Sequence, residues 1–224
     1  MSYGACAVVG SGGTLRNAHH GREIDAHDAV IRFNLAPTGG EWLEAVGSRS
    51  TFRLFNGQSR SRHTLVRANT SHELLYCPFD KWLGKCILSA VSFRTSTTST
   101  RVGVGASRPL PWLMVNPVLI WQAAQLQHAH GGRHVRMVST GLLGVVLALA
   151  MCETVSLYGF GNQSAAAALA TGVSASTCGH YWECSRNQSR YFGGKAGYHD
   201  WKAQWRVVQH FVDAGAVRFV GNSL

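Results

Sequence analysis

Three short turns rich in glycine and hydroxyl side chains carry most of the chemistry that the sequence suggests. They are Gly10–Gly13, Ser139–Gly141 and Gly159–Gly161, and each follows a stretch that is predicted to form a strand. Glycine lets the backbone approach a ligand closely, and a helix that starts at such a turn offers unpaired N–H groups to a phosphate. The first turn lacks a complete G-x-G-x-x-G pattern because position 15 is leucine, so a tight turn without a ligand stays an open alternative. Three such turns in one chain favour a nucleotide-type site.

The charge balance points to an anionic ligand that is held without a metal ion. The chain has 21 Lys and Arg residues against 11 Asp and Glu residues, which gives a net charge of +10. This excess suits nucleic acid, a membrane surface, a nucleotide or an acidic sugar. No D-x-D sequence occurs, so the usual carboxylate pair for a nucleotide-bound divalent metal is absent. Backbone N–H groups and His, Lys or Arg side chains would therefore have to neutralise any phosphate.

Strand-like and helix-like segments alternate along the chain, as they do in α/β folds. Strands are predicted over residues 5–9, 29–34, 50–55, 74–77, 134–138, 154–158 and 216–220. Helices are predicted to start at Asn116-Pro117, at Ser139-Thr140 and at Asp200, since these residue types favour helix N-termini. In the last helix, the spacing of Trp201 and Trp205 predicts a place in the core. The 224 residues fit one domain, residues 1–224, with a largely parallel sheet flanked by helices.

Simple patterns exclude several other classes of protein. No run of 18 apolar residues is present, so no segment is predicted to span a bilayer. The first ten residues have neither a basic region nor a cleavage site, and are therefore not a signal peptide. The six cysteines form no C-x-x-C pair, which argues against zinc ribbons and thioredoxin-type sites.

Four segments, in a fixed order, carry a family resemblance. Residues 6–55 begin CAVVGSGG and include AVIRFNLAPT, and residues 139–161 read STGLLGVVLALAMCETVSLYGFG. His-Tyr-Trp-Glu follows at 180–183, and His199 precedes a helix that begins DWKAQW. In this order they resemble the L, S, III and VS sialylmotifs of animal-type sialyltransferases, glycosyltransferase family 29.

The resemblance implies a Rossmann-like fold of the GT-A-variant type and a particular reaction. Sialic acid would pass from CMP-sialic acid to a glycan hydroxyl on a glycoprotein or glycolipid, with inversion and without a metal or other cofactor. The STG and HYWE sequences resemble the α2,3 group, which transfers to galactosides. The family is anchored in the membrane of the Golgi and works in its lumen. An anchor is therefore expected upstream of the residues given, and no nucleic-acid partner is expected.

The resemblance also assigns roles to residues, by motif match. The CMP donor would contact Ser11, Gly12, Asn34, Ser139, Thr140, Gly141, Gly159 and Gly161. Cys6 and Cys152 match the cysteines that join the L and S motifs by a disulfide, which requires an oxidising compartment. The pairing of the other four cysteines stays open: Cys77, Cys86, Cys178 and Cys184.

The two motif histidines would do the acid–base chemistry. His199 would be the general base that takes the proton of the acceptor hydroxyl, and His180 would donate to the departing CMP phosphate. A histidine before a helix is also an ordinary capping residue, and Tyr181 and Trp182 are as easily packing residues as ligand contacts. The histidines without motif context are predicted to lie on the surface: His19, His20, His128 and His130.

The sequence departs from the family at two positions. The VS motif has Glu five residues after its histidine, where this chain has Gln204, and glutamine cannot support an imidazolium by charge. Ser11 stands where relatives often have the longer Asn. These differences favour an alternative function, a catalytically weakened homologue that binds a CMP-sugar. The acid sugar carried on CMP stays open.

Two unrelated ligand classes fit less well. A nucleic-acid module predicts a basic stripe interleaved with aromatic residues, but the cluster Arg60, Arg62 and Arg67 has no aromatic residue near it. A nicotinamide enzyme predicts an acidic residue at the end of the second strand, whereas Asp25 and Asp28 precede that strand.

Overall fold

The computed structural model describes residues 2–56, 70–77, 112–132, 138–160, 179–183 and 199–221. Within these ranges seven parallel strands form one sheet in the order β5-β4-β3-β2-β1-β6-β7. The strands are β1 (Tyr3–Val9), β2 (Ala29–Phe33), β3 (Ser50–Asn56), β4 (Thr70–Tyr76), β5 (Trp112–Met114), β6 (Cys152–Tyr158) and β7 (Arg218–Val220). The predicted α/β, Rossmann-like class is confirmed.

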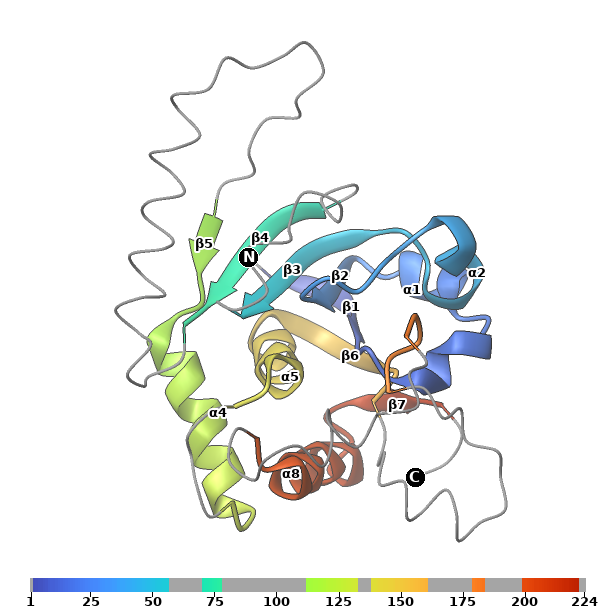
Figure 1. Ribbon diagram of the computed structural model, residues 1–224. Coiled ribbons are helices and arrows are strands. Elements are labelled where there is room, and N and C mark those ends of the chain that lie inside the picture. The colour runs from blue at the N-terminus through green and yellow to red at the C-terminus, as the bar shows by residue number, and fades with distance from the viewer. Residues whose placement is uncertain are drawn as a thin grey trace, which may run out of the picture.

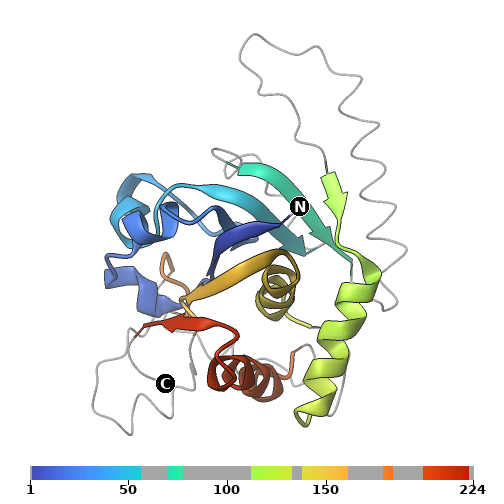
Figure 2. The ribbon, with the colours of Figure 1, turned by 180° about the vertical axis from the view of Figure 1, so that it is seen from behind.

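Helices cover both faces of the sheet (Figure 1). One face carries α4 (Pro117–Ala129), α5 (Thr140–Met151) and α8 (Trp201–Asp213). The other face carries shorter helices: η1 (Gly13–Asn17), α1 (Gly21–Asp25), η2 (Gly40–Trp42) and α2 (Leu43–Val46). The view from behind shows the same two layers, with α5 against the middle of the sheet (Figure 2).

The strand order places a topological switch point at the carboxyl ends of β1 and β6. The chain builds outward from β1 through β2, β3 and β4 to β5, and then crosses back to β6 on the other side of β1. The connections that follow β1 and β6 lie on opposite faces of the sheet, and this reversal defines the switch point. Ligands of doubly wound sheets bind at this place.

The three predicted helix starts are confirmed by side-chain caps. Asn116 Oδ1 accepts from Val118 N at 2.9 Å, with Pro117 as the first helical residue of α4. Ser139 Oγ accepts from Leu142 N at 3.1 Å, and Asp200 Oδ1 accepts from Ala203 N at 3.0 Å. Each cap satisfies a backbone N–H that lacks an intrahelical partner.

One core prediction is wrong, and one predicted strand lies almost entirely outside the described residues. Trp201 is 43% exposed, because the first residue of α8 lies beyond the hydrophobic cluster that Val207 and Val208 enter. Trp205 packs against that cluster and is partly buried. The strand predicted over 134–138 falls outside the described residues except at its last position. In the part of the chain that the structure describes, no helix is long and apolar enough to cross a membrane.

Candidate active site

The first and third glycine turns meet at the switch point. Gly10 N donates to the Tyr158 carbonyl at 2.7 Å, and Gly12 N donates to the Gly159 carbonyl at 3.1 Å. A Cβ on Gly10 would lie 2.7 Å from the Gly159 carbonyl oxygen, and Gly159 has a φ of +66°. Only glycine allows the close approach at position 10 and the positive φ at position 159 at little cost. The two turns are therefore in contact at the switch point, while Gly161 lies outside the described residues.

Asn34 brings the end of β2 to the same edge. It has a φ of 46° and is the one non-glycine residue with positive φ among the described residues. Asparagine is one of the few non-glycine residues that adopt this left-handed conformation as single residues. The side chain bridges two elements: its Oδ1 accepts from Asn56 N at 3.0 Å, and its Nδ2 donates to Thr140 Oγ1 at 3.5 Å.

The start of α5 adds a partly positive helix terminus. Ser139 caps the helix, and Thr140 and Gly141 form its first turn, where N–H groups have no intrahelical acceptor. Such a terminus attracts phosphate and carboxylate groups. A Cβ on Gly141 would meet its neighbours only at 3.5 Å or more, so Gly141 leaves room without being sterically required.

The turn 179–183 closes over the first glycine turn. His180 and Gly12 form an antiparallel bridge, and Tyr181 N donates to the Ser11 carbonyl at 3.1 Å. Arg16 Nη1 donates to the Tyr181 carbonyl at 3.0 Å. The Tyr181 ring is fully buried, and its hydroxyl donates to the Pro37 carbonyl. Tyr181 is thus a packing residue that places His180 at the switch point.

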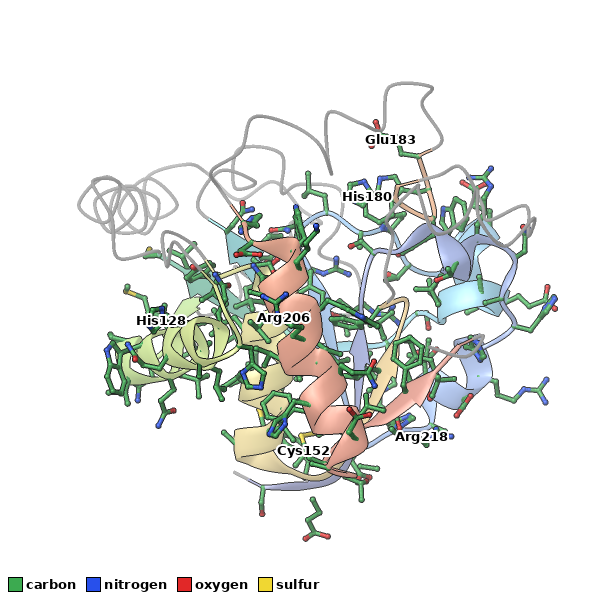
Figure 3. The ribbon with its side chains drawn as sticks, turned by 90° about the horizontal axis from the view of Figure 1, so that it is seen from below. His128, Cys152, His180, Glu183, Arg206 and Arg218 are labelled. Carbon is green, nitrogen blue, oxygen red and sulfur yellow. A yellow bond between two sulfur atoms is a disulfide. The ribbon has the colours of Figure 1, made fainter. Side chains whose placement is uncertain are left out.

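The His180 imidazole is held in a defined environment. It stacks on the Trp182 ring with 4.6 Å between centroids and 7° between planes. Its Nδ1 lies 3.7 Å from Glu183 Oε2, and both side chains are visible at the edge of the molecule in Figure 3. Burial lowers the pKa of His180 below its usual value, and the Glu183 carboxylate partly offsets this. The imidazole is therefore neutral at pH 7 in the free protein.

The start of α8 joins the site through Gln204. This side chain is 4% exposed, and its Oε1 accepts from Ser139 N at 3.3 Å. Gln204 thereby links α8 to the start of α5. His199 lies directly before the Asp200 cap, and its ring meets that of Trp201 edge-on with 4.9 Å between centroids. The position that departs from the family is thus buried at the site.

Two buried arginines behind the site were not anticipated. Arg32 and Arg53 pair in register on β2 and β3 and are 1% and 0% exposed. Burial lowers the pKa of each to about 10, so both stay charged at neutral pH. A charged residue inside the strand STFRLF is the signal that sequence reasoning could have used, since parallel strands are buried on both faces.

The predicted disulfide between Cys6 and Cys152 is confirmed. It links β1 to the start of β6 with 6.0 Å between Cα atoms. Cys77 is also disulfide-bonded, while Cys86, Cys178 and Cys184 lie outside the described residues.

A metal site would need several His, Cys, Asp or Glu side chains close together. The described residues contain no group of three or more such side chains that could hold a metal ion.

The chain belongs to glycosyltransferase family 29, the sialyltransferases, whose sequence profile it matches over residues 1–216. It is 31% identical over 217 residues to mouse CMP-N-acetylneuraminate-beta-galactosamide-alpha-2,3-sialyltransferase 1, a match that covers 95% of this chain and 58% of the mouse protein. The human protein of the same name is 33% identical over 218 residues, with 95% and 57% covered. The chain therefore spans less than two thirds of the length of these relatives.

Solved structures agree with this assignment. The crystal structure of a mammalian sialyltransferase has a TM-score of 0.70 and 27% identity, and the match covers 99% of this chain and 70% of that one. A mammalian sialyltransferase in complex with Gal-beta-1-3GalNAc-ortho-nitrophenol has a TM-score of 0.68, 25% identity and coverage of 99% and 70%. The Campylobacter jejuni sialyltransferase CstII with CMP-3FNeuAc shares the fold, with a TM-score of 0.59, 11% identity and coverage of 99% and 83%.

Proposed function

We propose that this protein is an inverting, metal-independent sialyltransferase that moves sialic acid from CMP-sialic acid to a galactoside hydroxyl in α2,3 linkage. The observation that carries the proposal is the convergence of the motifs at one edge of the sheet. The Gly10–Gly12 turn contacts the Gly159 and His180 turns, and Asn34 contacts the start of α5. Phe160, which follows Gly159, packs against Phe33 and lies next to Gly141, so it joins the two groups. The names of the α2,3-sialyltransferase relatives support the choice of donor and linkage.

The site offers neutral and dipolar groups for the CMP phosphate. The first turn of α5 has backbone N–H groups without intrahelical acceptors, and the imidazole of His180 adds a side-chain donor. Donors aimed at the position where charge develops stabilise a transition state strongly. Because these groups carry little net charge, they suit a phosphate that gains charge only as the bond to the sugar breaks.

The proposed reaction uses His199 as the general base. The acceptor oxygen attacks the anomeric carbon of sialic acid while the bond from that carbon to the CMP phosphate oxygen breaks. His199 takes the proton of the acceptor hydroxyl, and CMP leaves as a phosphate monoester near His180. Attack opposite to the leaving group inverts the anomeric centre, and an imidazole is suited to proton transfer near neutral pH.

A transfer assay with matched histidine variants tests the proposal. CMP-sialic acid and a β-galactoside are the substrates, and kcat is compared for wild type, His199→Ala and His128→Ala. His128 is exposed on α4, away from His180 in Figure 3, and serves as the control. Loss of a general base lowers the rate by about 10²–10⁴-fold. Equal rates for wild type and His199→Ala would exclude His199 as the base, and no transfer by wild type would exclude the reaction.

A second candidate function is a weakened homologue that binds the CMP-sugar with little turnover. The observation that favours it is Gln204, which is buried at the site where the family has glutamate. Calorimetry that detects CMP binding by a wild type without transfer activity would support this function. Gln204→Glu should then restore transfer, because a carboxylate supports the imidazolium that proton transfer creates. If Gln204→Glu leaves the rate unchanged, the glutamine is not what limits activity.

We further propose that the protein works in the lumen of the Golgi. The Cys6–Cys152 disulfide supports an oxidising compartment, since disulfides are rare in the cytosol. Fluorescence microscopy of the tagged full-length protein beside a Golgi marker tests this location, and a cytosolic signal would contradict it.

A further inference from the structure

Arg53 donates its hydrogen bonds to the backbone segment that follows β2. The side chain is fully buried on β3, and its Nη1 donates to the carbonyl oxygens of Asn34 at 3.1 Å and Ala36 at 2.9 Å. Among the described residues, its Nε and Nη2 have no hydrogen-bond partner. Burial of a charge with unmet donors is unfavourable. Two interactions offset it: the contacts to the segment after β2, and the attraction of the buried Glu73 carboxylate on β4.

The backbone of Asn34 is held on both sides. Asn34 N donates to the Leu54 carbonyl at 2.9 Å, which fixes the peptide before the residue. Arg53 Nη1 holds the Asn34 carbonyl, which fixes the peptide after it. Between these two anchors the residue adopts its φ of 46°, a left-handed conformation that asparagine tolerates better than most non-glycine residues and that the two contacts hold in place.

The imposed conformation decides where the Asn34 side chain lies. Its Nδ2 reaches Thr140 Oγ1 in the first turn of α5, and its Oδ1 accepts from Asn56 N. Relaxation of φ toward the right-handed or extended region would rotate the side chain away from both partners. The buried guanidinium therefore acts on the site edge through the backbone of one residue.

Arg32 offers a natural comparison, since it lies beside Arg53 on the same face of the sheet with nearly the same burial. Its Nε donates to the Arg49 carbonyl at 2.7 Å and its Nη2 to the Val46 carbonyl at 2.5 Å. Both acceptors belong to the segment around the end of α2, not to the Asn34 segment. The two arginines thus share burial and charge but differ in what they hold.

We propose that Arg53 is a positioning residue that holds Asn34 in its left-handed conformation, so that the Asn34 side chain is placed to bind the CMP part of the donor. The inference rests on the proposed function for the identity of the ligand. The guanidinium is planar, so the two N–H bonds of Arg53 Nη1 point in fixed directions and can donate to two carbonyl oxygens at once. A lysine ammonium at the same position keeps the charge but loses this fixed geometry.

The test compares Arg53→Lys with Arg32→Lys. Calorimetry with CMP gives the Kd, and thermal unfolding gives the stability of each variant. We expect both variants to lose stability to a similar degree, whereas Arg53→Lys raises the Kd about tenfold and Arg32→Lys by less than about twofold. In the transfer assay, Arg53→Lys should raise KM for CMP-sialic acid and leave KM for the acceptor unchanged. If Arg53→Lys does not fold, Arg53→Gln is tested in its place, because glutamine keeps N–H donors without the charge.

A double-mutant cycle tests whether Arg53 acts through Asn34. In an Asn34→Ala background, Arg53→Lys should change the Kd for CMP by less than about twofold, because the side chain that it positions is gone. Equal Kd values for wild type and Arg53→Lys would overturn the inference alone, as would the same tenfold loss in both backgrounds. A wild type that binds no CMP would overturn the proposed function and this inference with it.

Discussion

His180 combines a lowered pKa with a place at the phosphate end of the proposed donor site. The Trp182 ring covers one face of the imidazole, and the Glu183 carboxylate lies 3.7 Å from Nδ1. Burial keeps the ring neutral in the free protein, because it disfavours the charged form. A bound phosphate would favour the charged form, so ligand binding and protonation of this residue should be linked.

At the residue scale we therefore predict that CMP binding takes up a proton at pH 7. A bound phosphate would raise the pKa of His180 from its lowered value, so the complex should bind more protons than the free protein, and affinity should rise as the pH falls toward the free pKa. Calorimetry in buffers with different ionisation enthalpies measures the uptake. His180→Asn should abolish it, and His128→Asn should not. Uptake that persists in His180→Asn would assign the proton to another group.

At the scale of elements, α5 depends on how closely it approaches the sheet. A Cβ built on Gly144 would lie 2.4 Å from Phe33 Cε1 and 2.5 Å from Cζ, so this glycine lets the helix pack directly on β2. The same packing sets the start of α5 opposite Asn34 at the end of β2. The distance from helix to sheet and the geometry of the site edge are thus coupled.

We predict that Gly144→Ala destabilises the protein by about 1–3 kcal/mol, since the added methyl group overpacks the interface with Phe33. Gly141→Ala is the matched variant in the same helix, because its Cβ would meet only ordinary contacts at 3.5 Å or more. It should not destabilise, as alanine is the better helix former. Denaturant unfolding of both variants measures the difference. Equal stability of Gly144→Ala and wild type would show that Phe33 moves aside without cost.

At the scale of the whole molecule, the disulfide and the site occupy different ends of the same strands. Cys6 lies in β1 and Cys152 opens β6, whereas the Gly10 and Gly159 turns follow these strands. Figure 3 shows Cys152 at one end of the molecule and His180 at the other. The bond closes a loop with a sequence separation of 146, so it constrains the unfolded chain strongly.

We predict that Cys6→Ala combined with Cys152→Ala lowers the free energy of unfolding by about 2–5 kcal/mol. The Kd for CMP should change little at a temperature where the variant is folded. Unfolding in denaturant and calorimetry with CMP measure the two quantities separately. A large loss of affinity in the folded variant would mean that the bond also sets the geometry of the switch point.

The sequence by itself determined the class of fold and the local structure at several turns and helix starts. Its alternating pattern predicted the parallel sheet, and local residue chemistry at Asn116, Ser139 and Asp200 predicted the helix starts, because caps act within three residues. Glycine turns after strands predicted the ligand edge for a similar local reason. The motif resemblance implied the Cys6–Cys152 pair, which the structure contains.

Only the tertiary structure decided which distant residues support that edge. Arg53 holds the Asn34 backbone, Tyr181 holds Pro37, and Gln204 accepts from Ser139 across 65 positions of sequence. The pattern placed Trp201 in the core, yet it is exposed, because burial depends on what lies opposite the helix. Composition and periodicity record the preferences of a residue and its near neighbours. Contacts between distant segments depend on how the sheet and helices pack, and this packing places the buried arginines behind the site.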